Sequence, residues 1–135
     1  MMTIFNIGIK GIIEKEGRIL LVHDQRNGKD MWDVPGGRID ENESVEETLT
    51  RELQEELPGI TNIRIGELLS AKRVPGMVLG DKGLFLVCYK VEADLPSIVR
   101  TSEEHDQFEW VILEEAVNQV QETVRPALEK LLTQL

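Results

Sequence analysis

The sequence predicts an α/β fold of the α+β kind, a sandwich built on a mixed β-sheet. Strand-like segments precede and follow one amphipathic helix, and a second helical pattern closes the chain. A doubly wound parallel sheet would instead require strands and helices to alternate throughout. The length of 135 residues suits one domain with a sizeable core, which we place at residues 1–135.

Charge and composition exclude several classes of partner. The formal net charge of −10 argues against a surface that binds nucleic acid backbone, which would need a basic face. The N-terminal residues MMTIFNIGIKG lack the features of a signal peptide, and no apolar run is long enough to span a membrane. The single cysteine, Cys88, lies in the apolar run LFLVCYKV and is predicted to be a core residue. We therefore expect a cytoplasmic protein without nucleic acid or membrane partners.

The first part of the chain is predicted to form two strands. Apolar and β-branched residues extend from Ile4 to Ile13 and again from Arg18 to Val22. Glu16-Gly17 lies between them and is typical of a turn. The two segments therefore indicate a hairpin or two neighbouring strands.

A polar loop and a glycine pair follow. The loop from Asp24 to Asp30 contains an Asn-Gly pair, and we expect it to lie beside the functional site. Trp32 to Val34 is a short extended run that Pro35 ends. Gly36-Gly37 is then expected to form a turn, because glycine backbone can adopt positive φ or approach a ligand closely.

An amphipathic helix is predicted from about Val45 to Leu57. Ser44 and Glu47 have the S-x-x-E spacing of a capping box, which marks a helix start. Apolar residues then recur at every fourth position, at Val45, Leu49, Leu53 and Leu57.

The second half of the chain is predicted to contain three strands and a helical tail. The run from Leu84 to Val91 is almost continuously apolar, which indicates a central strand buried on both faces. Pro126 divides the helical tail by a kink or a break. In chain order the segments are a strand at Ile63 to Ala71, a loop at Arg73 to Gly83, the strand at Leu84 to Val91, an acidic connection at Ala93 to Gln107, a strand at Phe108 to Leu113 and the tail from Ala116 to Leu132.

Three carboxylates share one side of the predicted helix. Glu52, Glu55 and Glu56 fall within an arc of roughly 100°, beside the apolar stripe. Like charges at these spacings repel, so we expect a positive charge among them. Mg2+ prefers oxygen ligands and keeps waters and substrate phosphates as further ligands. The pattern therefore predicts a metal and phosphate platform, with a solvated acidic face as the alternative interpretation.

The spacing around these glutamates resembles a family signature. Gly37 and Glu43 precede the run Arg51-Glu52-Leu53-Gln54-Glu55-Glu56, and Gly59-Ile60 closes the pattern. This arrangement is similar to the Nudix box of the Nudix hydrolase family. The family has a single residue between the last glutamate and the glycine, whereas Leu57-Pro58 intervenes here. Pro58 is expected to stop the helix at or just before Leu57.

The resemblance implies a mixed sheet between helices and the roles of several residues. Gly37 would shape the turn beside the metal. Arg51 would pair with carboxylates of the box, Glu43 among them, with an ordinary surface ion pair as the alternative. Mg2+ is the implied cofactor, and Mn2+ is an alternative. The implied metal ligands are Glu52, Glu55, Glu56 and the backbone carbonyl of Gly36.

Similar enzymes take their general base either from the box or from a loop nearer the C-terminus. The loop candidates here are Glu103 and Glu104. We favour Glu104, because Glu104-His105 followed by Trp110-Val111 is similar to the E-H-x4-W-V stretch of several nucleotide-cleaving members. His105 would then contact the leaving group or the nucleobase, unless it is a surface histidine. The proposed catalytic residues are therefore Arg51, Glu52, Glu55 and Glu104.

Other candidates for substrate binding come from the loops. Arg26 and Arg73 are basic loop residues that would bind substrate phosphates if they do not simply face solvent. Trp32 would stack on a base or belong to the core. His23 has no partner visible in the sequence and is interpreted as structural.

The leading hypothesis is a Mg2+-dependent pyrophosphohydrolase that cleaves a nucleoside diphosphate linked to another moiety. Nucleoside triphosphates and dinucleoside polyphosphates are the favoured substrates. The alternatives are an ADP-ribose or nucleotide-sugar pyrophosphatase, and a Nudix-like module that senses a nucleotide without cleaving it. An isomerase of isoprenoid diphosphates would need an activated cysteine, for which Cys88 is poorly placed. A homodimer is compatible with the sequence.

Overall fold

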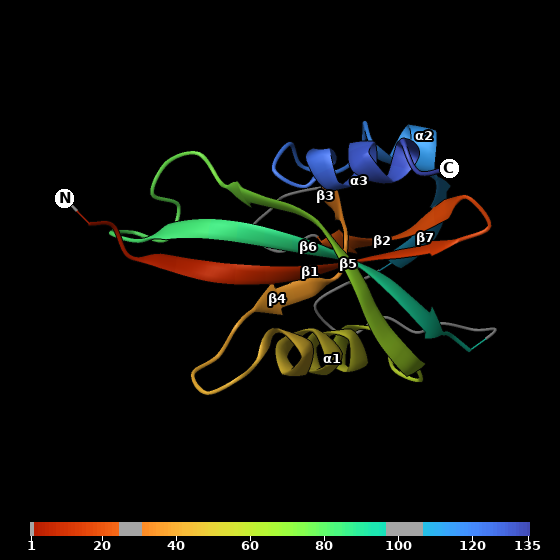
Figure 1. Ribbon diagram of the computed structural model, residues 1–135, viewed down its shortest axis with the longest axis horizontal. Helices are drawn as coiled ribbons and strands as arrows, with labels where there is room; N and C mark the ends of the chain where they lie inside the picture. Colours follow the sequence, from red (N-terminus) through yellow and green to blue (C-terminus); the bar gives the residue numbers. More distant parts are fainter. Residues whose placement is uncertain (1, 25–30, 97–106) are drawn as a thin grey trace.

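The computed structural model describes residues 2–24, 31–96 and 107–135 (Figure 1). No helix within these ranges is long and apolar enough to cross a membrane. The strands are β1 Phe5–Lys15, β2 Arg18–Asp24, β3 Met31–Asp33, β4 Gly36–Arg38, β5 Thr61–Arg73, β6 Gly83–Asp94 and β7 Gln107–Ile112, and the helices are α1 Val45–Glu56, α2 Leu113–Ala116 and α3 Arg125–Leu132.

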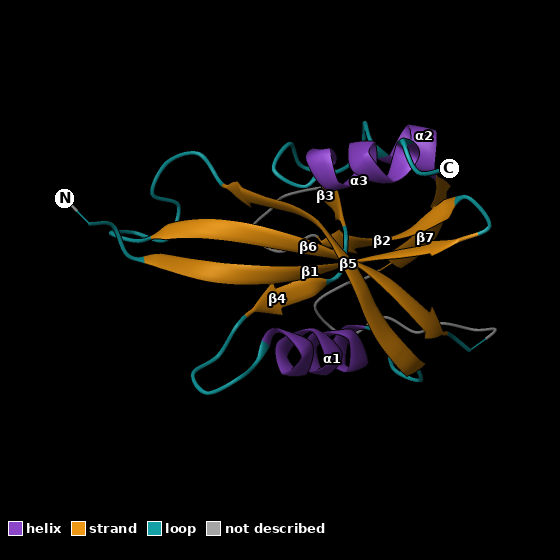
Figure 2. Cartoon of the chain, in the orientation of Figure 1, coloured by secondary structure: helices purple, strands orange, loops and turns teal. Residues whose placement is uncertain are grey.

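A mixed sheet forms the middle layer of the molecule. Its strand order is β3-β2-β1-β6-β5, and β4 and β7 pair with β1 and β2 respectively. β1 and β6 run parallel, whereas the other pairs are antiparallel. Helix α1 covers one face of the sheet, and α2 and α3 cover the other (Figures 1 and 2). The predicted mixed-sheet sandwich is therefore confirmed.

Strand β6 supplies side chains to both halves of the core. Leu86 and Cys88 pack in the cluster beneath α2 and α3, whereas Val87 and Val91 pack in the cluster beneath α1. This division follows from the alternation of side chains along a strand. Cys88 is 0% exposed, as expected for a core residue. The predicted burial of this strand on both faces is confirmed.

Helix α1 begins where the sequence predicts. The Ser44 hydroxyl accepts a hydrogen bond from the Glu47 N–H, and the Glu47 carboxylate accepts one from the Ser44 N–H, each at 3.1 Å. This reciprocal pair is the predicted capping box. Leu49, Leu53 and Leu57 are all fully buried. Together, the cap and the leucines fix the rotation of the helix about its axis, which determines where its carboxylates point.

The one residue that is additional to the family spacing lies in a tight turn directly after α1. The Leu57 N–H still bonds to the Leu53 carbonyl at 2.9 Å, and the Ile60 N–H bonds to the Leu57 carbonyl at 3.1 Å. Pro58 and Gly59 are the central residues of this turn, and Gly59 has a φ of 94°, as the third position of a type II turn requires. Leu57 and Ile60 are both buried, so the turn that joins α1 to β5 is anchored in the core at both ends.

Two local expectations were wrong, and a third was correct only in part. Gly36–Arg38 forms strand β4 rather than a turn, because it pairs with residues 8–10 of β1. Leu113 begins α2 instead of ending a strand. The tail contains two separate helices, as the alternative of a break predicts, but Pro126 lies in the first turn of α3 and not at the break. Its missing N–H there leaves no intrahelical bond unmade.

The capping box provides a test of the local stability of α1. Ser44→Ala should lower the free energy of unfolding by about 1 kcal/mol, because the Glu47 N–H loses its acceptor. Urea unfolding followed by circular dichroism measures this difference. Ser44→Asp keeps an acceptor and should remain close to wild type. Equal stability of all three proteins would contradict the capping role.

Candidate active site

Strand β4 presents the backbone of Gly36 to α1. The Gly11 N–H bonds to the Pro35 carbonyl at 2.9 Å, which marks a hydrogen-bonded pair of the β1–β4 ladder. Because such pairs alternate in an antiparallel ladder, the neighbouring pair of Lys10 and Gly36 is a non-hydrogen-bonded one. The N–H and carbonyl of Gly36 therefore face away from β1. The N–H bonds to Oε2 of Glu56 at 2.9 Å.

The glycine pair is required by the close approach of β1, β4 and α1. A Cβ atom at Gly37 would overlap the carboxylate of Glu52. Gly36 has a φ of 148°, and a Cβ atom there would overlap the backbone carbonyl of Ile9. The two glycines thus allow the carboxylates of Glu52 and Glu56 to lie directly against the strand.

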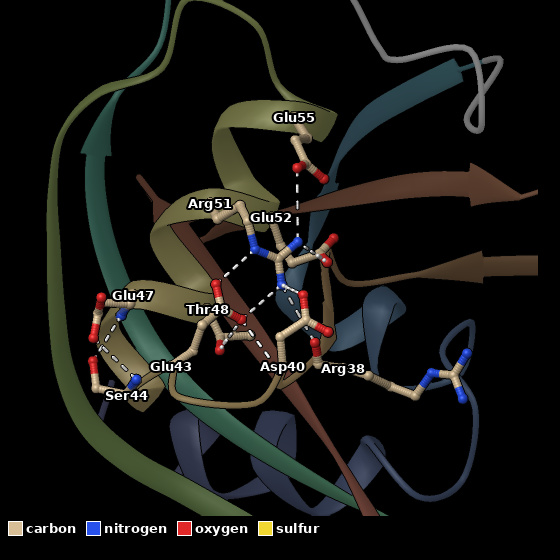
Figure 3. A network of polar contacts seen from close by, with 9 residues as sticks. All are labelled: Arg38, Asp40, Glu43, Ser44, Glu47, Thr48, Arg51, Glu52 and Glu55. Carbon is tan, nitrogen blue, oxygen red and sulfur yellow. Dashed lines mark hydrogen bonds and ion pairs between the residues drawn. The ribbon is translucent and has the colours of Figure 1, made fainter.

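Arg51 lies at the centre of the carboxylate cluster (Figure 3). Its Nε and Nη2 bind the two carboxylate oxygens of Glu43 at 2.8 and 3.0 Å, and its Nη1 binds Oε1 of Glu52 at 2.8 Å. Longer ion pairs reach Glu55 at 3.7 Å and Asp40 at 3.6 Å. A planar guanidinium with five donors can bind several carboxylates at once. Arg51 therefore supplies a positive charge among the glutamates.

Glu43 is fixed by donors from three residues, two on α1 and one in the connection before it. Besides Arg51, its Oε1 accepts hydrogen bonds from the Asp40 N–H and the Thr48 hydroxyl, each at 3.0 Å. The hydrogen bonds from Arg51 are the main reason that the pKa of Glu43 falls from 4.5 to about 2. The same contacts raise the pKa of Arg51. The pair therefore remains charged over the physiological range of pH.

The three glutamates of the predicted metal platform differ in exposure. Glu56 is 4% exposed, whereas the side chains of Glu52 and Glu55 are 16% and 59% exposed. Glu56 is held by Gly36, and Glu52 is drawn towards Arg51. The platform therefore extends from the buried edge of the sheet to the surface of α1.

The donors of this platform fit a hard divalent cation. They are all carboxylate or carbonyl oxygens, the ligands that Mg2+ prefers. Within residues 2–24, 31–96 and 107–135, no three acidic, histidine or cysteine side chains are grouped so that they could hold a metal ion by themselves. Mg2+ does not require such a group, because it usually takes one or two carboxylates beside waters and substrate phosphates. The chemistry of the donors is thus suited to an open site.

A second polar cluster lies on the α2–α3 side of the sheet, beside the same glycine pair. Lys10 Nζ lies 3.3 Å from Asp33 Oδ2 and 3.4 Å from the Val34 carbonyl. Gln121 donates a hydrogen bond to Asp33 Oδ2 at 2.7 Å. Burial alone would lower the pKa of Lys10, but the charges of Asp33 and Glu56 raise it above its ordinary value. This cluster is not apparent in the sequence, because its members are far apart in the chain.

The remaining predicted residues lie away from α1 or outside the described residues. Trp32 is on β3, where its ring centroid lies 4.9 Å from that of His23 and its side chain packs against the core. The Arg73 guanidinium lies over the Phe5 ring, 4.9 Å from its centroid, and bonds to Met77 Sδ at 3.7 Å. The candidates outside the described residues are Arg26, Glu103, Glu104 and His105.

The contacts of Glu43 predict a stability that depends on pH. Because the pKa of Glu43 is lower in the folded protein, its contribution is complete above the unfolded value near 4.5 and is lost as the pH falls towards about 2. Glu43→Gln should therefore be less stable than wild type at neutral pH, and the two proteins should converge between these pH values. Urea unfolding at a series of pH values measures the difference.

Glu41→Gln makes the same change in net charge within the same connection and serves as the control for that series. If the difference in free energy of unfolding between wild type and Glu43→Gln stayed constant from neutral pH down to about 2, the role of the Glu43 charge would be contradicted.

Comparison with known proteins places this arrangement in a family. A family model described as a NUDIX domain matches residues 2–135. The chain is 28% identical over 115 residues to the phosphatase NudJ of Escherichia coli, a match that covers 82% of this chain and 70% of NudJ. It is 36% identical over 72 residues to an ADP-ribose pyrophosphatase of Methanocaldococcus jannaschii. That match covers 51% of this chain and 43% of the length of the relative.

Solved structures show the same architecture. The ORF135 protein of E. coli has a TM-score of 0.80 at 26% identity, with 97% of this chain and 91% of that chain covered. A MutT NUDIX hydrolase from Burkholderia pseudomallei has a TM-score of 0.78 at 28% identity, with 93% and 97% covered. The match over residues 2–135 agrees with the box on α1 and the glycine pair on β4. The chain therefore belongs to the NUDIX family and is a Nudix hydrolase.

Proposed function

We propose that this protein is a Mg2+-dependent pyrophosphohydrolase that cleaves a nucleoside diphosphate linked to another moiety. The observation that carries the proposal is the ordered set of carboxylates on α1. Glu52 and Glu56 lie against the glycine pair of β4, and Glu55 extends the same side of the helix towards solvent. A surface that gathers so many oxygen ligands around one buried edge suits a divalent cation bound to a diphosphate.

The proposed metal ligands are Glu52, Glu55, Glu56 and the carbonyl of Gly36. This carbonyl faces away from β1, on the side where the Gly36 N–H binds Glu56. The cation is proposed to be Mg2+, with Mn2+ as the alternative. When bound, such a cation neutralises charge on the phosphoryl oxygens and orients the substrate.

The proposed reaction is attack of water on one phosphorus of the diphosphate. A bond forms between the water oxygen and phosphorus, the bond from that phosphorus to the bridging oxygen breaks, and two phosphorylated products leave. A carboxylate must accept the proton of the water. We propose Glu52 or Glu55 of the box, or Glu104 of the C-terminal loop, for this role.

Arg51 is proposed to act on the reaction through its neighbours. Its guanidinium holds Glu52 and Glu43 at 2.8 Å each, so it limits the positions open to the Glu52 carboxylate. Such outer contacts typically change metal affinity or activity by about 10- to 100-fold. Arg51 and Glu43 therefore support the metal site together with Gly37, whose missing side chain leaves room for Glu52.

The favoured substrates remain nucleoside triphosphates and dinucleoside polyphosphates, for which Glu104-His105 is the supporting feature in the sequence. ADP-ribose or a nucleotide sugar is the second candidate, because the relative that is 36% identical over 72 residues is an ADP-ribose pyrophosphatase. Arg26 and Arg73 are proposed to bind substrate phosphates, and Trp32 and His105 to contact the base or leaving group.

A binding module that senses a nucleotide without hydrolysing it is less well supported. All three glutamates of the box are present, and Arg51 and Gly36 hold two of them in place. A domain used only for binding would not need to keep this arrangement of mutually repelling carboxylates.

Substitution of the glutamates tests the metal platform. Glu55→Gln and Glu56→Gln should each lower turnover by roughly two to four orders of magnitude, because each loses a charged ligand or base. Steady-state kinetics with Mg2+ measures turnover, and circular dichroism checks folding. Glu46→Gln lies on the exposed first turn of the same helix and should remain near wild type. Nearly normal turnover in both Glu55→Gln and Glu56→Gln would contradict the assignment of these glutamates as metal ligands.

A substrate panel identifies the compound that is cleaved. Nucleoside triphosphates, dinucleoside polyphosphates, ADP-ribose and nucleotide sugars should be assayed with Mg2+ in 18O-labelled water. We expect one class to be hydrolysed to two phosphorylated products, one of which carries the label on the attacked phosphorus. Tight binding of one compound without turnover across the panel would favour the sensing module instead.

A further inference from the structure

Hydrogen bonds hold the backbone of residues 34–36, which leads from β3 into β4 and sets the position of Gly36. The Val34 N–H bonds to Asp33 Oδ1 at 2.8 Å, and the Val34 carbonyl accepts a bond from Lys10 Nζ at 3.4 Å. Pro35 has no N–H, and its carbonyl belongs to the β1–β4 ladder. The next polar atom along the chain is the Gly36 N–H, which binds Glu56. A shift of Val34 would therefore move the group that holds Glu56.

Lys10 is the positively charged member of this arrangement, and it is largely buried. Its side chain is 16% exposed, and that of its partner Asp33 is 14% exposed. An ion pair at this depth interacts more strongly than one on the surface, although burying the charges also costs desolvation. Gln121, in the connection between α2 and α3, donates a further hydrogen bond to Asp33 at 2.7 Å. The cluster thus links the α2–α3 layer to the segment that leads to Gly36.

The geometry points to Lys10 as a positioning residue for Glu56 and the Gly36 carbonyl, acting through Asp33 and Val34. This inference rests on the proposed metal site. Lys10 and Asp33 lie on the side of the sheet opposite α1, so they position the Gly36 carbonyl through the backbone of residues 34–36 and not through contact with substrate. The charge of Lys10 also acts directly on Glu56. Residues that orient metal ligands from outside typically change metal affinity by about 10- to 100-fold.

A purely structural ion pair would behave differently from a positioning residue. Loss of a structural pair lowers stability and the fraction of folded enzyme, so turnover falls at every concentration of Mg2+. Loss of a positioning residue weakens the metal site in protein that is still folded. The two roles can therefore be distinguished by measuring how activity and metal binding depend on the metal concentration.

The test uses Lys10→Met/Asp33→Asn, which removes both charges and leaves neither one buried alone. We expect the Kd for Mn2+, measured by isothermal titration calorimetry without substrate, to rise about 10- to 100-fold. The Mg2+ concentration that gives half-maximal activity should rise by a similar factor, while turnover at saturating Mg2+ stays within a few fold of wild type. Lys15→Met, an exposed lysine on the same strand, is the matched control and should bind Mn2+ like wild type.

Gln121→Ala provides a milder variant that leaves the ion pair intact. It removes one donor to Asp33 and should raise the Kd for Mn2+ in the same direction by a smaller factor. Wild-type affinity for Mn2+ in both folded variants would overturn the positioning role and leave the proposed hydrolase intact. Failure of the wild-type protein to bind Mn2+ or Mg2+ would overturn the metal site itself and the inference with it.

Discussion

The repulsion among the carboxylates of α1 is the constraint on which the rest of the site depends. Glu52, Glu55 and Glu56 lie on one side of a single helix, where like charges at these spacings destabilise the folded state. Arg51 offsets part of this cost by binding Glu43 and Glu52, and the Gly36 N–H satisfies Glu56. The capping box and the buried leucines hold the helix in the rotation that these contacts require. Local stability and the proposed metal chemistry therefore use the same few residues.

The parts of the structure that could be predicted from the sequence are those with local causes. The capping box determines the start of α1 from residues three positions apart, and Pro58 determines its end, because a proline disfavours helical backbone in the residue before it. The burial of β6 on both faces likewise follows from an almost unbroken apolar run. Each of these signals is contained within a short stretch of chain.

The parts that could not be predicted depend on contacts between distant segments. Gly36–Arg38 forms a strand only because β1 lies beside it, and two glycines by themselves favour a turn. Lys10, Asp33 and Gln121 are unremarkable in the sequence, and their hydrogen bonds exist only after β1, β3 and the α2–α3 connection have come together. The graded exposure of the three glutamates has the same origin, since it is set by the distance of each from the sheet.

The parallel pairing of β1 with β6 has a consequence for how the protein folds. The ladder extends from Phe5 and Gly83 to Ile13 and Val91, so almost the whole first part of the chain lies between its two strands. Closing so long a loop before the contacts form is costly in entropy, and proteins with such non-local pairing fold slowly. The α1 helix and the β5–β6 hairpin can form early, because their contacts are local. Until β1 docks, one edge of β6 remains unpaired, and that interval is when the chain is most exposed to aggregation.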